Sequence, residues 1–180
     1  SPSTTVNGAT SKSVDVLSKY EFPRVRRLDR EGGLVWQWPV KDEWVAGVAD
    51  EVLPWPDGSG YVALVAAFGT VVKLGEGAQA GKVLWVTKVR QDLSQFYTPR
   101  GLFLDDGSLM VAGAGPKTGS HATSPVLSRL NGLGTVAWRK VYIEPIPTVV
   151  GGFARAASGT LVVAGHSQHS AAEGPVRVLG

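Results

Sequence analysis

The sequence predicts an all-β protein, and within that class a β-propeller. An internal repeat of about fifty residues occupies nearly the whole chain, a period typical of propeller blades. Each copy contains four short apolar or β-branched runs separated by glycine-containing turns, as antiparallel hairpins require. No stretch shows sustained apolar spacing at i, i+3, i+4 and i+7, so no helix is expected. Four antiparallel strands per repeat correspond to one blade.

Composition favours a single globular domain over residues 1–180. The chain has 43% hydrophobic and 18% charged residues, which excludes bulk disorder and a coiled coil. Its 23 glycines and 11 prolines indicate many turns. The absence of cysteine excludes disulfides, zinc–thiolate sites and cysteine nucleophiles.

The first repeated signature is a strand ending in leucine, a glycine turn and a strand containing tryptophan. Leu28 precedes Trp36, and Leu130 precedes Trp138, by the same number of residues. The middle copy, from Leu74 to Trp85, is longer because its loop at 75–81 has extra residues. This signature predicts the third and fourth strands of each unit, and recurrence of the tryptophan predicts packing between blades.

The second signature predicts the first and second strands of each unit. The run Asp106-Gly107-Ser108-Leu109-Met110-Val111-Ala112-Gly113 matches Ser158-Gly159-Thr160-Leu161-Val162-Val163-Ala164-Gly165, and residues 57–64 repeat it with one insertion. The expected first strands are 45–53, 96–104 and 148–156. The expected second strands are 61–68, 109–114 and 160–165, with a partial one at 4–9. The expected third strands are 23–28, 70–74, 125–130 and 175–179, and the expected fourth strands are 34–40, 83–89 and 135–142.

The phase of the repeat leaves about 3.5 blades visible, which corresponds to a partial propeller or a small four-bladed one. We expect the propeller to be completed either by the rest of a longer chain or by a protein partner, because open strand edges invite aggregation. In the alternative, one composite blade closes the ring and residues 1–13 pair with 175–180. Residues 1–13 are expected to form either a second strand of the first blade or a flexible tail.

The motifs Leu28-Asp29-Arg30-Glu31-Gly32-Gly33-Leu34-Val35-Trp36 and 106–113 resemble those of bacterial β-propeller repeat families, and loosely the quinoprotein-like repeats. The resemblance implies a scaffold that serves many activities and favours a secreted or cell-surface location. Two departures stand out. Lys73-Leu74-Gly75 lacks the acidic residue, and the last unit lacks its fourth strand.

Candidate ligand-binding residues lie in or beside the loops at one face of the predicted propeller. They are Trp44, Tyr97, His121, His166 and His169. Trp44 could stack on a sugar ring or anchor a partner, or could simply cover the core edge. Three imidazoles on one face could hold a transition metal. However, His166 and His169 would point to opposite faces of a strand, which favours solvated loop histidines. We predict no metal site and no cofactor.

Acid–base chemistry is the remaining catalytic option. Asp42, Glu43 and Asp50 lie in or beside a loop of the same face and stay open as general acids or bases. Asp50 and Glu51 are neighbours, so on a strand they would point to opposite sides.

The function predicted from the sequence is a non-catalytic scaffold that binds a ligand or a partner protein through its loop face. The alternatives are a propeller enzyme, either metal-assisted or carboxylate-based, and a structural subunit completed by another chain. A carbohydrate or another small ligand is a further candidate. The net charge of +3 is too small for a typical nucleic-acid binder. The longest apolar run, residues 61–72, is too short to cross a membrane as a helix.

Overall fold

The computed structural model describes residues 23–38, 47–66, 69–89, 96–116, 123–142 and 148–167. This part of the chain is all-β and consists of antiparallel strands in four sheets. The strands are β1 (Val25–Leu28), β2 (Leu34–Trp38), β3 (Ala49–Pro54), β4 (Gly60–Val65), β5 (Thr70–Gly75), β6 (Val83–Lys88), β7 (Tyr97–Phe103), β8 (Leu109–Pro116), β9 (Thr123–Leu130), β10 (Val136–Val141), β11 (Thr148–Arg155) and β12 (Leu161–Ser167). The expected strands at 4–9 and 175–179 lie outside the described residues.

The order of strands in the sheets follows the repeat. Sheets β3–β4–β5–β6 and β7–β8–β9–β10 are four-stranded meanders, whereas β1–β2 and β11–β12 are two-stranded. The third and fourth strands of one unit therefore begin the described chain, and the first and second strands of another end it. All twelve strands fall at predicted places, with their ends shifted by a few residues.

The expectation of no helix is wrong at one short turn. Gly77–Gln79 forms a 3₁₀ helix, η1, inside the long loop between β5 and β6. The extra residues of this loop close the turn through hydrogen bonds from Gln79 N to Glu76 O and from Ala80 N to Gly77 O. No helix in the described residues is long and apolar enough to span a bilayer.

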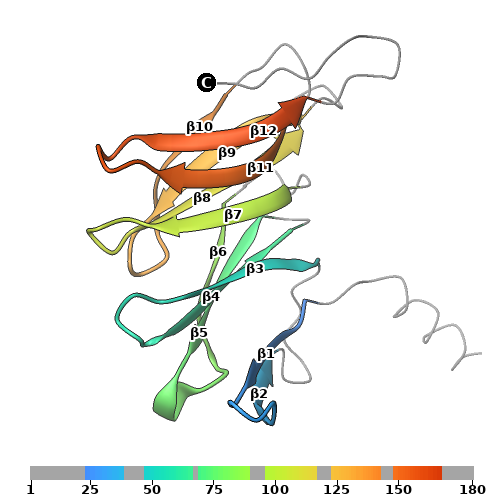
Figure 1. Cartoon of the computed structure of the whole chain (residues 1–180), viewed down its shortest axis with the longest axis vertical. Helices are drawn as coiled ribbons and strands as arrows, with labels where there is room; N and C mark the ends of the chain where they lie inside the picture. The colour runs from blue at the N-terminus through green and yellow to red at the C-terminus, as the bar shows by residue number, and fades with distance from the viewer. Residues whose placement is uncertain are drawn as a thin grey trace, which may run out of the picture.

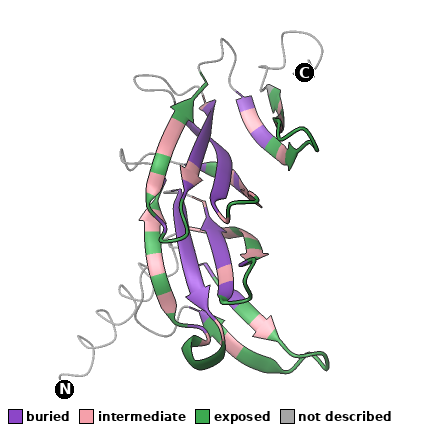
Figure 2. Ribbon diagram, turned by 90° about the vertical axis from the view of Figure 1, so that its left-hand side faces the viewer, coloured by how far each residue is buried: buried purple, intermediate pink, exposed green. Residues whose placement is uncertain are grey.

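The four sheets stack face to face in chain order, from β1–β2 at one end to β11–β12 at the other (Figure 1). Each pair of successive sheets encloses one hydrophobic cluster. The central strands of the stack are buried on both faces, as Figure 2 shows. Their sequences are nearly continuous apolar runs because neither face meets water.

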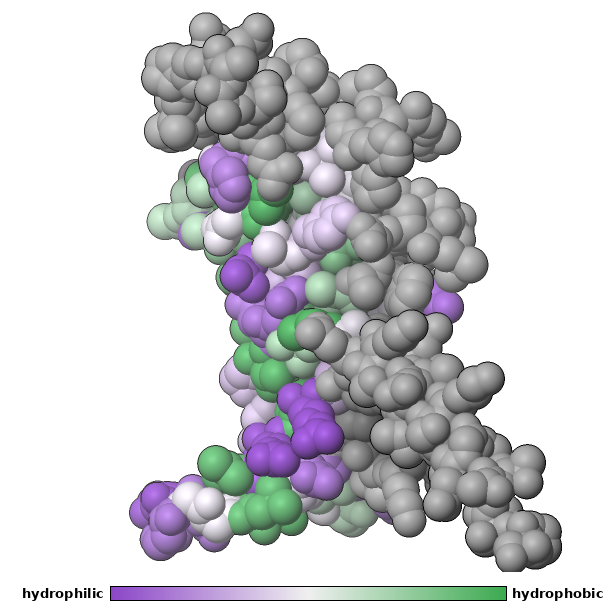
Figure 3. All heavy atoms as spheres, turned by 90° about the vertical axis from the view of Figure 1, so that its right-hand side faces the viewer, coloured by the Kyte–Doolittle hydropathy of each residue, from purple (hydrophilic) through white to green (hydrophobic). Residues whose placement is uncertain are grey.

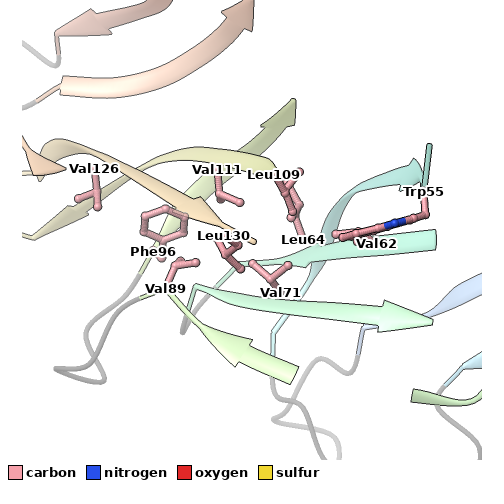
Figure 4. Packing of buried hydrophobic residues seen from close by; sticks show 10 residues of the cluster. All are labelled: Trp55, Val62, Leu64, Val71, Val89, Phe96, Leu109, Val111, Val126 and Leu130. Carbon is pink, nitrogen blue, oxygen red and sulfur yellow. The ribbon is translucent and has the colours of Figure 1, made fainter. Parts of the chain in front are cut away.

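The largest cluster lies between the two four-stranded sheets (Figure 4). Leu64 and Val71 of one sheet face Leu109 and Val111 of the next, and Phe96 packs beside them. All five side chains are almost completely buried. At about 1.5–3 kcal/mol for each fully buried large apolar side chain, this layer holds the two sheets together.

The repeated tryptophans lie between neighbouring sheets, as the sequence predicts for blade-to-blade packing. Trp36 of β2 meets Tyr61 of β4 edge to face, with ring centroids 5.8 Å apart. Trp85 of β6 packs against Gly134 in a turn of the next sheet, and it meets Trp55, which follows β3 of its own sheet, edge to face at 6.0 Å. Both indoles are partly buried against the adjoining clusters.

The short hairpin turns gather along one side of the stack, at the left of Figure 1. The first strands of successive units, β3, β7 and β11, contact one another along the stack. The face in Figure 3 has hydrophilic and hydrophobic residues interspersed over its described surface. Within the described residues the stack forms no closed ring.

Candidate functional site

Two of the predicted ligand-binding residues, Tyr97 and His166, are described by the structure. Trp44, His121 and His169 lie outside the described residues, as do Asp42 and Glu43. Tyr97 and His166 lie at the edge at which β7 and β11 begin and β12 ends, opposite the short hairpin turns.

Tyr97 is the first residue of β7 and pairs with Ala114 of β8. Its side chain is 41% exposed. A β-bulge between Tyr97 and Arg100 follows at once and bends the strand. Tyr97 is thus an exposed aromatic residue at the rim of a rigid sheet.

Thr98, inside this bulge, has a φ of 45°, the only positive value outside glycine in the described chain. Its hydroxyl donates a hydrogen bond of 2.7 Å to the carbonyl oxygen of Val150 in β11. A residue before proline avoids helical backbone, and Pro99 follows here. The positive φ of Thr98 costs on the order of 1–3 kcal/mol and persists only where neighbouring residues stabilise it. The bond to Val150 is the contact that holds it.

His166 lies near the end of β12 and is exposed. It pairs with Val149, the neighbour of Val150. The Thr98–Val150 hydrogen bond therefore brings the start of β7 to the same edge as His166. Tyr97 and His166 share one edge of two adjacent sheets, as the sequence predicts for a common loop face.

Sequence reasoning missed a second set of contacts, between the first strands β3 and β7. A carboxylate oxygen of Glu51 accepts a hydrogen bond of 2.6 Å from Gly101 N. Partial burial raises the pKa of Asp50, while the positive charge of Arg100 opposes that rise. The only sequence signal was the Asp50-Glu51 pair beside a loop.

The Asp50-Glu51 pair does not form a two-carboxylate acid–base site. The two residues are adjacent at a β-bulge of β3, where Asp50 is exposed and Glu51 is partly buried. The Glu51 carboxylate already accepts a hydrogen bond from the backbone N–H of Gly101 in the next sheet. Its role in this geometry is to join the first strands of two sheets.

Charged groups at the hairpin edge stabilise turns. Asp106 accepts hydrogen bonds from the Ser108 hydroxyl and backbone N–H, and it pairs with Arg129. The Ser108 hydrogen bonds, with a smaller contribution from Arg129, hold the pKa of Asp106 below its usual value. The equivalent hydrogen bonds from Ser59 hold the pKa of Asp57 below its usual value.

Lys73 occupies the repeat position of Arg129. Its ammonium lies 3.7 Å from the ring centre of Trp55, a cation–π contact. Partial burial lowers the pKa of Lys73, and the nearby carboxylate of Asp57 opposes the shift. These contacts tie a turn to the neighbouring strand.

The described residues contain no group of three His, Asp or Glu side chains placed to hold a metal ion. They do contain a groove of about 630 Å³ between sheet β7–β10 and strand β12. Leu127, Trp138, Lys140 and Tyr142 form one wall, and residues 161–165 of β12 form the other. The sequence offered no direct signal for this groove, because it arises where β12 ends its sheet.

No protein-family model matches this sequence, and no curated protein shows significant similarity to it.

Proposed function

We propose that this chain is a non-catalytic scaffold of the β-propeller type that binds a ligand or a partner protein at the edge carrying Tyr97 and His166. The observation that carries the proposal is the placement of both exposed side chains at one edge of two adjacent sheets, joined through Thr98 and Val150.

The stacking of the sheets supports the propeller part of the proposal. Successive four-stranded meanders repeat the same strand order, and the first strands of neighbouring sheets contact one another. A propeller repeats such sheets radially around its first strands. The two-stranded sheets at the ends are then parts of further blades.

The character of the edge supports the binding part. Binding residues are commonly carried on loops and strand ends that a rigid scaffold positions. An exposed tyrosine offers both an apolar ring and a hydroxyl, which suits sugars and peptide side chains. An exposed histidine can donate or accept a hydrogen bond.

A protein-observed NMR screen with small-molecule fragments, including monosaccharides, tests this edge. We expect the shifted amides to gather around residues 97 and 166. Tyr97→Ala and His166→Ala should each weaken binding at least tenfold, equivalent to about 1.4 kcal/mol. Leu133→Ala is the control because Leu133 is highly exposed in a hairpin turn at the opposite edge. Shifts elsewhere, or variants that bind like the parent, would contradict the proposal.

A second role, as a subunit completed by additional strands, is favoured by the groove beside β12. In the described part of the chain, β12 pairs only with β11, although the equivalent strands β4 and β8 each pair on both sides. By comparison with the four-stranded sheets, the groove lies where the third and fourth strands of this unit would pack.

A further inference from the structure

We propose that the turn between β9 and β10 is a site of spontaneous deamidation, at which Asn131 is converted to aspartate. The reaction consumes only water and needs no second protein. It is independent of the proposed ligand site, because this hairpin turn lies at the opposite edge of the sheets from Tyr97 and His166 (Figure 1).

The sequence supplies the reactive pair of residues. The chain contains two asparagines, Asn7 and Asn131, and a glycine follows each of them. Deamidation begins when the backbone nitrogen of the following residue attacks the side-chain carbonyl carbon, and glycine favours this attack because it has no Cβ to obstruct it. Asn7 lies outside the described residues. Asn131 and Gly132 are both exposed, so water and hydroxide reach them.

Hydrogen bonds within the turn hold the side-chain oxygen of Asn131. Its Oδ1 accepts hydrogen bonds from Leu133 N at 3.0 Å and from Thr135 N at 2.9 Å. The side-chain NH₂ group, which leaves as ammonia, is a donor only and takes no part in these bonds. Backbone bonds from Asn131 N to Thr135 O and from Gly134 N to Asn131 O close the turn. Among the described residues, these four bonds leave out the N–H of Gly132, which is the attacking nitrogen.

The two N–H groups on Oδ1 are placed to stabilise the attack. As the nitrogen of Gly132 bonds to Cγ of Asn131, negative charge develops on Oδ1. Two backbone donors on that oxygen form an oxyanion hole, which stabilises the charged intermediate more than the neutral amide. Hydroxide takes the proton of the attacking nitrogen, and water protonates the departing NH₂ group. The Cγ–Nδ2 bond breaks, and the products are ammonia and a cyclic succinimide.

The same two donors select which bond water opens in the succinimide. Attack of water on Cγ breaks the bond from Cγ to the nitrogen of Gly132 and gives aspartate. Attack on the backbone carbonyl carbon of residue 131 gives isoaspartate, which is the main product in a flexible peptide and adds one methylene to the backbone. Because the two N–H groups face the oxygen on Cγ, the folded turn favours attack at Cγ. The folded protein should therefore form mainly aspartate.

The turn between β1 and β2 shows that this structure accepts the product. Asp29 occupies the repeat position of Asn131, and its Oδ1 accepts hydrogen bonds from Glu31 N at 3.1 Å and from Gly33 N at 2.6 Å. The backbone N of Asp29 also donates to Gly33 O. These bonds match those of Asn131, so aspartate fits there without rearrangement, and its charge strengthens the two bonds to Oδ1. Conversion lowers the formal net charge of +3 by one.

Peptide mapping of the aged protein tests the proposal. Trypsin places the two asparagines in different peptides, 1–12 and 130–139. After several weeks in neutral buffer, peptide 130–139 of the folded chain should contain mainly aspartate at residue 131. In the chain unfolded in urea, both peptides should contain mainly isoaspartate, which an isoaspartyl methyltransferase labels specifically. The ratio of aspartate to isoaspartate at residue 131 should be at least about tenfold higher in the folded chain, since preorganised oxyanion donors can change rates by more than this.

Gly132→Ala is the matched control for the attacking nitrogen. Among the described atoms, a Cβ at residue 132 would meet only Cζ2 of Trp55, at 4.0 Å, so the turn should be retained. Deamidation of Asn131 in this variant should be at least about tenfold slower, because the methyl group obstructs the attack. Asn131→Asp is the preformed product. It should co-elute with the aged parent chain in ion-exchange chromatography and melt no lower than the fresh parent.

An amide that persists at residue 131 in the folded chain, while the unfolded chain loses it, would overturn the proposal. So would isoaspartate as the main product of the folded chain, or equal rates of deamidation in the parent chain and Gly132→Ala.

Discussion

The indole of Trp85 lies directly against Gly134, the turn glycine of the neighbouring sheet. A Cβ at residue 134 would stand 2.6 Å from Cδ2 of the indole, closer than two carbons can approach. The Gly134 backbone also has a φ of +79° and its carbonyl accepts a hydrogen bond from the Thr87 hydroxyl. The contact between these two sheets at Trp85 therefore requires glycine at residue 134.

Gly134→Ala should destabilise the protein beyond the cost of its backbone conformation. The left-handed backbone costs about 1–2 kcal/mol for a residue with a Cβ, and overpacking against the indole adds about 1–3 kcal/mol. Gly107→Ala separates the two effects, because Gly107 has a φ of +76° and no atom within 4 Å of its would-be Cβ. Urea unfolding measures both variants. Equal losses would show that the Trp85 contact does not matter.

Phe96→Ala should cost about 3–5 kcal/mol in free energy of unfolding, the usual loss for a buried phenylalanine. Phe96 is almost completely buried between the two four-stranded sheets. A Cβ on Gly113 would lie 2.3 Å from its ring. Gly113→Ala should therefore be much less harmful in the Phe96→Ala background than alone. Additive losses in a double-mutant cycle would contradict this packing.

Glu51→Ala should weaken the junction between β3 and β7. The Gly101 N–H loses its acceptor, and an unsatisfied, partly buried donor costs about 1–3 kcal/mol. Glu51→Gln keeps an acceptor oxygen and should lose less. Hydrogen exchange at the Gly101 amide is the specific readout: it should accelerate in Glu51→Ala and stay slow in Glu51→Gln. Unchanged exchange in both variants would exclude the bond as a source of protection.

Asp106→Asn should lower the melting temperature at neutral pH, and this difference should shrink in acid. Because the folded-state pKa of Asp106 lies below its ordinary value, the ionised carboxylate stabilises the folded protein above the unfolded pKa. That contribution disappears as the pH falls through the folded pKa. Thermal melts of the parent and the variant between about pH 2 and pH 7 check this. A constant difference over that range would mean that the charge is not responsible.

The positions of the strands could be predicted from the sequence because each type of strand recurs in several copies of the repeat. Leu28, Leu74 and Leu130 mark the ends of equivalent strands, and the glycine turns after them mark where the chain reverses. A hairpin depends on alternation and turn residues close together in the chain. All twelve strands of the described residues could therefore be predicted within a few residues, as could the packing of Trp36 and Trp85 between sheets. Of the candidate site, Tyr97 and His166 were predictable as residues of one edge.

Other features required the tertiary structure. The bulge at Thr98 and its bond to Val150 join two units, as does the Glu51 bond to Gly101, and none of these has a local sequence pattern. The groove beside β12 exists only because no described strand continues that sheet.

The sequence by itself determined the strand order, the turns and the all-β class, since these depend on neighbours along the chain. Only the tertiary structure decided which equivalent residues are covered. Leu28 and Leu74 hold the same position in the repeat, but one is exposed and the other is buried. Burial depends on whether another sheet lies across the face, and that neighbour is distant in sequence.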